Sequence, residues 1–208
     1  MDLETAEPAP DTSLSRRSLV TRAGAAGLAG LAAAFVIDRN ALVAATAPED
    51  RPGVRTDDDR VVLARVIEIE LAASALYRLA LENATDDLAV AIGVMADNHR
   101  SYAEAISGAT GISAGQPNEE LVAEFEPFFS GSADEFLASA HTLEQTLVST
   151  HTSLIADYES TNSISLTSAI AVVEARHATV IADLLGVDDL DVLFGNEESP
   201  LDLTGDDA

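Results

Sequence analysis

Glu174 and His177 are three residues apart, a spacing that places a carboxylate and an imidazole one turn apart on one helix face. Ile170 falls on the same face, so both polar side chains are expected to point into apolar surroundings. A carboxylate buried among aliphatic side chains is costly unless it is paired or bound to a metal ion. An inward Glu-x-x-His pair on a bundle helix is typical of dinuclear carboxylate sites. The pair therefore predicts metal binding, with an ion pair between Glu174 and Arg78 or Arg176 as the alternative.

Three other segments of helical period also carry a polar residue on their apolar side. Glu70 falls on such a stripe, whereas Glu68 is expected to face solvent. Glu144 supplies one carboxylate, and His99 supplies one imidazole. Ala96 stands three residues before His99, where a bridging glutamate would complete a second Glu-x-x-His pair. The predicted metal ligands are Glu70, His99, Glu144, Glu174 and His177.

The alanine at position 96 changes the charge balance of a two-metal site. Two divalent ions bring four positive charges, whereas three carboxylates supply only three negative ones. We therefore expect a weakened dinuclear centre or the loss of one metal position. His141, one turn before Glu144, is close enough to add an imidazole, whereas His151 is two turns after it and is expected to be too far away to share the same ion. Both histidines are interpreted as ordinary helix residues.

Four long helices must position these side chains. We expect Asp57 or Asp58 to cap the first helix, and Ser132 with Glu135 to form a capping box on the third. The second helix is expected to end at Gly108. The predicted helices cover residues 58–83, 87–107, 133–159 and 165–185.

The connection between the second and third helices, residues 108–131, is much longer than the other two. It contains a short helix that Asn118 is expected to cap, and Phe125, Phe128 and Phe129 are expected to pack this helix onto the end of the bundle. Four helices with one long crossover predict an all-α fold with ferritin-like topology over residues 57–186.

Composition limits the partners. The chain has 208 residues with 36 acidic and 11 basic side chains, giving a net charge of -25, and every basic residue is an arginine. Nucleic acid and anionic membrane surfaces are therefore excluded as partners, whereas metal cations are attracted. No cysteine is present, so any metal must be held by oxygen and imidazole nitrogen.

Residues 1–47 form an acidic segment followed by Ser15-Arg16-Arg17-Ser18 and an uncharged run from Ala23 to Ile37. This pattern resembles a twin-arginine (Tat) export signal and predicts a periplasmic, cell-surface or extracellular protein. The run is short for a membrane span, which needs about 20 residues, so no stable span is expected in the mature chain. Residues 195–208 are expected to form a disordered acidic tail.

The bundle segment resembles the exported ferritin-like proteins, a group that includes desiccation-related proteins. The resemblance covers about residues 58–186 and is carried by Glu70 to Arg78, Leu143-Glu144-Gln145, Val173 to Ala178, and Leu184-Leu185-Gly186. It implies iron or manganese as cofactor, held by the five predicted ligands, one carboxylate fewer than the family's six.

Three functions stay open at this point. The first is an exported metalloprotein that oxidises Fe(II) or protects against peroxide or oxygen. The second is a non-catalytic binding or stress-protective module with a degenerate metal site, for which Ala96 is the direct indication. A storage cage is the least favoured. A homo-oligomer is one possible assembly, and the sequence decides neither the oligomeric state nor whether the protein is an enzyme.

Overall fold

The computed structural model describes residues 55–203, and the predicted export signal therefore lies outside the described residues. This part of the chain is helical. Its helices are α3 (Asp57–Leu81), α4 (Asp86–Thr110), α5 (Glu119–Phe129), α6 (Ala133–Asp157), α7 (Thr161–Leu184) and α8 (Leu190–Phe194).

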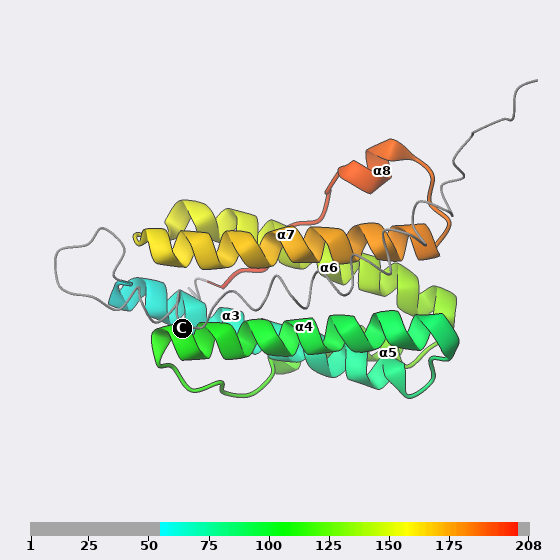
Figure 1. Cartoon of the computed structure of the whole chain (residues 1–208), viewed down its shortest axis with the longest axis horizontal. Helices are drawn as coiled ribbons and strands as arrows, with labels where there is room; N and C mark the ends of the chain where they lie inside the picture. Colours follow the sequence, from blue (N-terminus) through cyan, green and yellow to red (C-terminus); the bar gives the residue numbers. More distant parts are fainter. Residues whose placement is uncertain (1–54, 204–208) are drawn as a thin grey trace, which may run out of the picture. The chain divides into compact units, whose positions relative to one another are not determined.

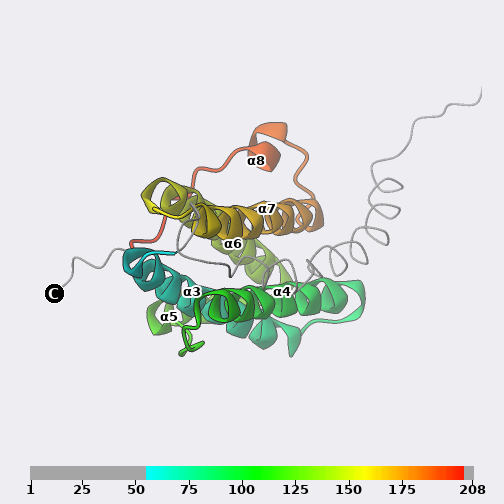
Figure 2. The same cartoon turned by 60° about the vertical axis from the view of Figure 1, so that its left-hand side comes forward.

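The four long helices form two antiparallel hairpins, α3 with α4 and α6 with α7 (Figure 1). Short turns join the helices within each hairpin, whereas residues 111–132 cross from one hairpin to the other and include α5. Figure 2 shows the two hairpins facing each other from a second direction. The predicted four-helix bundle with a long crossover between its second and third helices is confirmed.

Helix α5 lies against α3 and α6, one helix from each hairpin. Asn118 caps it as expected, because its side chain accepts a hydrogen bond from the Leu121 backbone at 2.8 Å. Phe125 and Phe129 are buried, but the prediction for Phe128 is wrong, since its side chain is 48% exposed. The helix therefore presents one aromatic side to the bundle.

The helix ends follow local capping chemistry. Ser132 and Glu135 form the predicted capping box at the start of α6. The cap of α3 is Thr56 instead of Asp57 or Asp58, which are already helical. Helix α4 continues through Gly108 to Thr110, and Gly111 caps it with a φ of 71°, the left-handed conformation that glycine adopts readily.

Asp59 is a buried carboxylate that ties the start of α3 to the turn between α6 and α7. It accepts hydrogen bonds from the backbone of Glu159 at 2.9 Å and of Ser160 at 3.1 Å, and from the Ser163 hydroxyl at 2.8 Å. Burial alone raises the pKa of Asp59, but these hydrogen bonds outweigh it and lower the pKa below its usual value. Ser160 in turn caps α7, which starts one turn earlier than predicted.

Replacing Asp59 by alanine should therefore lower the free energy of unfolding by about 2 to 4 kcal/mol, because three donors lose a charged acceptor. Urea unfolding followed by circular dichroism measures the change. Asp58→Ala is the matched control, since Asp58 is exposed and its loss should change stability by less than about 0.5 kcal/mol. Equal effects of the two substitutions would show that the three hydrogen bonds of Asp59 do not contribute to stability.

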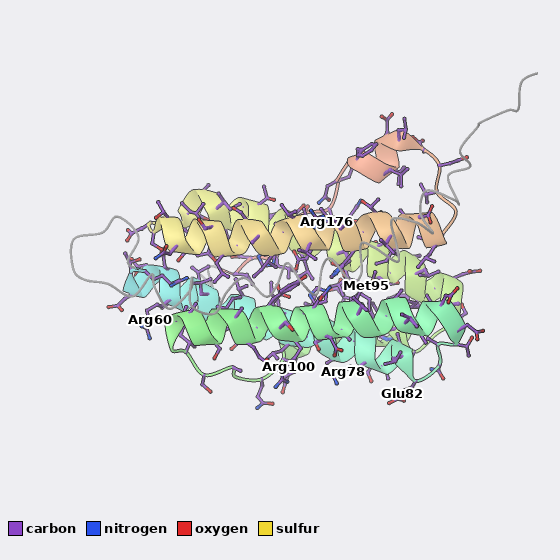
Figure 3. All side chains as sticks on the ribbon, in the orientation of Figure 1. Arg60, Arg78, Glu82, Met95, Arg100 and Arg176 are labelled. Carbon is purple, nitrogen blue, oxygen red and sulfur yellow. The ribbon has the colours of Figure 1, made fainter. Side chains whose placement is uncertain are left out.

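Charged side chains cover the outside of the bundle. Figure 3 shows Arg60, Arg78, Glu82 and Arg100 on the outside, while Met95 points between the helices. Among residues 55–203, only α7 is long and apolar enough to cross a membrane. Ile170 and Ile181 of this helix belong to the bundle core, whereas Val172, Val180 and Leu184 are exposed.

Residues 195–203, which we expected to be disordered, lie along α6. The Asn196 side chain donates to the Gln145 carbonyl at 2.8 Å, and the Ser149 hydroxyl donates to the Glu198 carbonyl at 2.7 Å. Farther on, the Leu201 backbone donates to the Thr150 hydroxyl at 2.9 Å. The Ser149 and Thr150 side chains of α6 thus hold this acidic segment by its backbone, and Asn196 adds a side-chain contact. Acidic composition alone does not reveal these contacts.

Candidate metal centre

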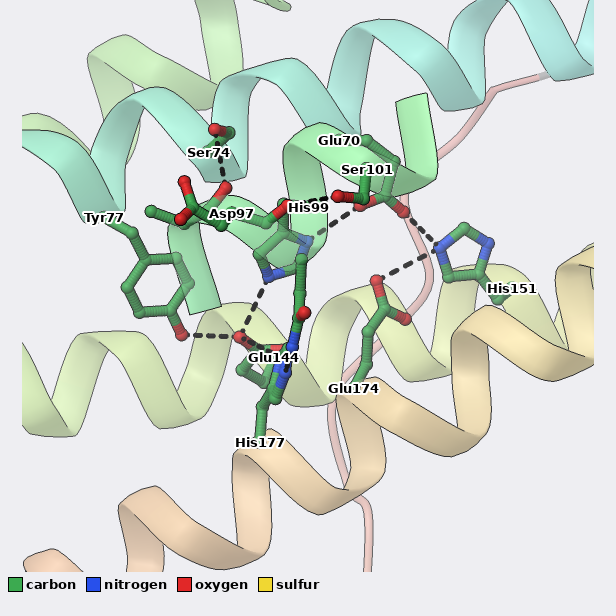
Figure 4. Close-up of polar contacts among 12 residues, drawn as sticks. Glu70, Ser74, Tyr77, Asp97, His99, Ser101, Glu144, His151, Glu174 and His177 are labelled. Atoms are coloured by element: carbon green, nitrogen blue, oxygen red, sulfur yellow. Dashed lines mark hydrogen bonds and ion pairs between the residues drawn. The ribbon is translucent and has the colours of Figure 1, made fainter. Parts of the chain in front are cut away.

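The two hairpins bring the five predicted ligands together in one buried cluster, and they add a sixth residue, His151 (Figure 4). Glu70 comes from α3, His99 from α4, Glu144 and His151 from α6, and Glu174 and His177 from α7. All six side chains are at most 5% exposed. The cluster is therefore shielded from solvent by the four long helices.

Glu70 lies between two histidines. Its Oε2 is 2.8 Å from His99 Nδ1, and its Oε1 is 2.9 Å from His151 Nε2. Burial alone raises the pKa of Glu70, but the hydrogen bonds with His151 and His99 outweigh it and lower the pKa to about 2. This carboxylate is ionised over the whole physiological range.

Glu144 occupies the other side of His99. The Tyr77 hydroxyl donates to Glu144 Oε1 at 2.5 Å, and His99 Nε2 lies 3.1 Å from the same oxygen. His177 Nδ1 is 3.3 Å from it, without hydrogen-bond geometry. Burial raises the pKa of Glu144, but the nearby His177 and His99 outweigh it and hold the pKa well below its usual value.

Glu174 is less well paired than the other two carboxylates. His151 Nε2 lies 3.2 Å from its Oε1 at an angle that does not make a hydrogen bond. Burial raises the pKa of Glu174 to about 7, although the charge of His151 opposes the shift. The alternative ion pair with an arginine is wrong, because Arg78 pairs with Asp97 at the surface and Arg176 is exposed.

His99 is the centre of the cluster. Its ring stacks on Tyr77, with centroids 5.5 Å apart and an interplanar angle of 10°, so its two nitrogens are directed at Glu70 and Glu144. Burial lowers the pKa of His99, but Glu144 and Glu70 outweigh it and raise the pKa well above its usual value. Without a metal ion, the protonated ring is thus an internal counterion for both carboxylates.

The interpretation of His151 as an ordinary helix residue is wrong. It is fully buried, and Glu174 and Glu70 raise its pKa to about 10 although burial itself lowers it. The spacing in the sequence could have indicated this role. His151 follows Glu144 by seven residues on α6, and Tyr77 follows Glu70 by seven residues on α3. Across the bundle, His151 contacts Glu70 and Tyr77 contacts Glu144. His141 is only half-buried, and its ring lies 3.4 Å from the Gln145 side chain.

Ala96 stands where a second Glu-x-x-His pair would have its glutamate, and it is buried. Its carbonyl accepts a hydrogen bond from the Ser74 hydroxyl at 2.8 Å. The next residue but one, Asn98, reaches across to α7, where its Nδ2 lies 3.0 Å from His177 Nε2. This contact leaves His177 Nδ1 directed into the cluster. The amide nitrogen can only donate, so His177 Nε2 accepts in this contact, and a cation on Nδ1 would require the Asn98 side chain to turn its oxygen toward Nε2.

Several atoms of the cluster are not satisfied by protein groups. Glu144 Oε2, both oxygens of Glu174, His151 Nδ1 and His177 Nδ1 are buried and have no hydrogen-bond partner among the described residues. Buried carboxylate oxygens without a donor are rare and costly, and a bound cation is the ordinary remedy. Two overlapping groups have donor atoms close enough to hold an ion: Glu70, His99 and Glu174, and His99, Glu144 and His177. Oxygen and imidazole nitrogen together suit iron, manganese and zinc.

Comparison with known proteins gives one match. The family model described as the ferritin-like domain matches residues 58–187, which span the four long helices and the crossover. No curated protein and no solved structure matches the chain.

Proposed function

Because the chain belongs to the ferritin-like domain family, we propose that it binds iron or manganese between its four long helices. The observation that carries this proposal is that four buried atoms of Glu144, Glu174 and His177 have no hydrogen-bond partner among the described residues: Glu144 Oε2, Glu174 Oε1, Glu174 Oε2 and His177 Nδ1. Each is a metal-ligand atom type, and together they belong to two neighbouring helices. A cation placed among them would neutralise carboxylate oxygens that receive no hydrogen bond from the described residues.

Iron or manganese bound here would supply one-electron chemistry with oxygen or peroxide, so we propose Fe(II) oxidation or peroxide removal as the activity. The chain's own part is to hold and shield the ion. Glu70, Glu144 and Glu174 offer carboxylates, and His99 and His177 offer imidazoles. Tyr77 stays protonated and donates a hydrogen bond to Glu144, because burial and the charge of that carboxylate raise the pKa of Tyr77 well above the usual value.

The test is metal content per chain in protein reloaded with Fe(II) or Mn(II), comparing the natural sequence with Glu174→Gln. Glutamine keeps the size of the side chain but removes the charge that holds the cation. We expect the natural chain to retain at least one ion per chain through gel filtration and the variant to lose it. Asp183→Asn removes an exposed carboxylate of the same helix and is the matched control.

Retention of the same metal content by Glu174→Gln would contradict a site at this carboxylate. Absence of tightly held metal from both proteins would favour the second function, a non-catalytic ferritin-like module with a degenerate site. One observation favours that alternative: His99 and His151 already pair with carboxylates of the cluster without an ion. Ala96 also favours this alternative, because the cluster has no fourth carboxylate at that buried position.

We also propose that the protein is exported by a Tat-type pathway. The support is Ser15-Arg16-Arg17-Ser18 followed by the uncharged run that ends at Ile37. This pathway carries folded proteins, so an ion buried among four helices would be loaded before export.

A further inference from the structure

We propose that His151 is a metal ligand and that it completes a single-ion position with Glu70, His99 and Glu174. This inference rests on the proposed metal-binding function and specifies which residues of the cluster hold the ion. It assigns a role to a histidine that the sequence pattern left out.

The distances around His151 are those of atoms that share an ion. Its Nε2 lies 2.9 Å from Glu70 Oε1 and 3.2 Å from Glu174 Oε1. Ligand atoms placed about 2.1 Å from one ion are separated by about 3.0 Å in octahedral and 3.4 Å in tetrahedral geometry. Glu70 and Glu174 already belong, with His99, to one of the two groups whose donor atoms lie within 4.8 Å of one another. His151 is in neither group, so its ring must move toward His99 before all four residues can share one ion.

Comparison with Tyr77 separates a ligand from a simple hydrogen-bond donor. Tyr77 has the same seven-residue spacing from Glu70 that His151 has from Glu144. Its hydroxyl is directed at Glu144 alone, with good hydrogen-bond geometry. His151 Nε2 instead faces two carboxylates from different helices, and only its contact with Glu70 has hydrogen-bond geometry. A nitrogen that lies between two carboxylates can bind the same metal ion as a third ligand.

The four residues also balance the charge of one divalent ion. Glu70 and Glu174 supply two negative charges, and neutral His99 and His151 supply two nitrogens. The donors come from all four long helices, one from each of α3, α4, α6 and α7. Glu144 and His177 form the second group only together with His99, which would already bind the first ion through its other nitrogen. A neutral imidazole binds a metal through one nitrogen, so the second position is the weaker one. We therefore expect one tightly bound ion per chain.

The donor set also predicts a metal preference. Two imidazoles with two carboxylates are richer in nitrogen than a site with four carboxylates and two imidazoles. Imidazole favours Fe(II) and Zn(II), whereas Mn(II) is better matched by oxygen ligands. The natural chain should bind Fe(II) more tightly than Mn(II).

The experiment compares the natural chain with His151→Gln, His141→Gln and Glu174→Gln. Glutamine at position 151 can still donate a hydrogen bond to Glu70, so this variant keeps the packing while removing the imidazole. His141→Gln makes the same exchange on the same helix, at a ring that lies against Gln145. The measurements are ions per chain, affinity by chelator competition, and the visible absorption of bound Co(II), which reports the loss of a nitrogen ligand.

We expect His151→Gln to lower the affinity by more than about 100-fold, beyond the loss that follows removal of an outer-shell partner. Its Co(II) spectrum should change, while that of His141→Gln should not. A smaller loss with an unchanged spectrum, in a chain where Glu174→Gln still abolishes binding, would overturn the assignment of His151 and leave the proposed function intact. Absence of tight binding from the natural chain itself would overturn both.

Discussion

Replacing His99 by alanine is expected to lower the free energy of unfolding of the metal-free protein by about 3 to 5 kcal/mol. The substitution removes the ring nitrogens that lie 2.8 Å from Glu70 and 3.1 Å from Glu144. It also opens a cavity beside Tyr77, against which the ring stacks. Two buried carboxylates would then lose their shared counterion. Urea unfolding in the presence of a chelator measures the loss.

His141→Ala is the control for His99→Ala, because it removes the same side chain from a half-buried position outside the cluster. Its effect should stay below about 1 kcal/mol. A loss of the same small size for His99→Ala would mean that Glu70 and Glu144 are compensated without this ring. The electrostatic account of the cluster would then be wrong.

The metal-free protein is expected to lose stability as the pH rises from 6.5 toward 10. His151 has a pKa of about 10 in the folded chain, against an ordinary value of 6.5, and the pKa of His99 is also raised. Their contribution is complete below pH 6.5 and disappears as the pH rises through the folded-state values, because the folded chain then binds more protons than the unfolded one. Each unit of pKa difference corresponds to about 1.4 kcal/mol, so the loss should reach several kcal/mol.

Bound metal should reverse this trend. A metal ligand must be deprotonated, so the protons on His99 and His151 compete with the ion, and affinity rises with pH. Urea midpoints measured across the same pH range, with chelator and with one equivalent of Fe(II) or Zn(II), distinguish the two states. The His151→Gln variant is the control, and its metal-free profile should be flatter. A urea midpoint that does not change with pH in the natural metal-free chain would show that His99 and His151 are not protonated as assigned.

The helical bundle and five residues of the cluster could be predicted because they depend on spacing within single helices. Glu174 and His177 share a face whatever the neighbouring helices do, and Glu70 interrupts an otherwise apolar stripe. The missing ligand at position 96 could be predicted in the same way, since an alanine side chain has no atom that binds a metal. These predictions needed only the helical period and the cost of burying charge.

His151 could not be placed by the same reasoning, because its partners lie on other helices. Its distance along α6 from Glu144 seemed to exclude it from the site, yet it lies opposite Glu70 and Glu174. That register depends on how the two hairpins dock, which no single helix encodes. The path of residues 195–203 was not predicted for a similar reason. Its hydrogen bonds with α6 come mostly from backbone groups, and acidic composition says nothing about them.

The division of the cluster between two hairpins has a consequence for the order of events during synthesis. The first hairpin carries only Glu70 and His99, while Glu144, His151, Glu174 and His177 all follow the crossover. A ribosome that has finished the first hairpin has therefore exposed one carboxylate and one imidazole, too few to retain a cation. The complete set of donors exists only after the last long helix has been made and docked. Metal capture would thus report that the whole bundle has assembled.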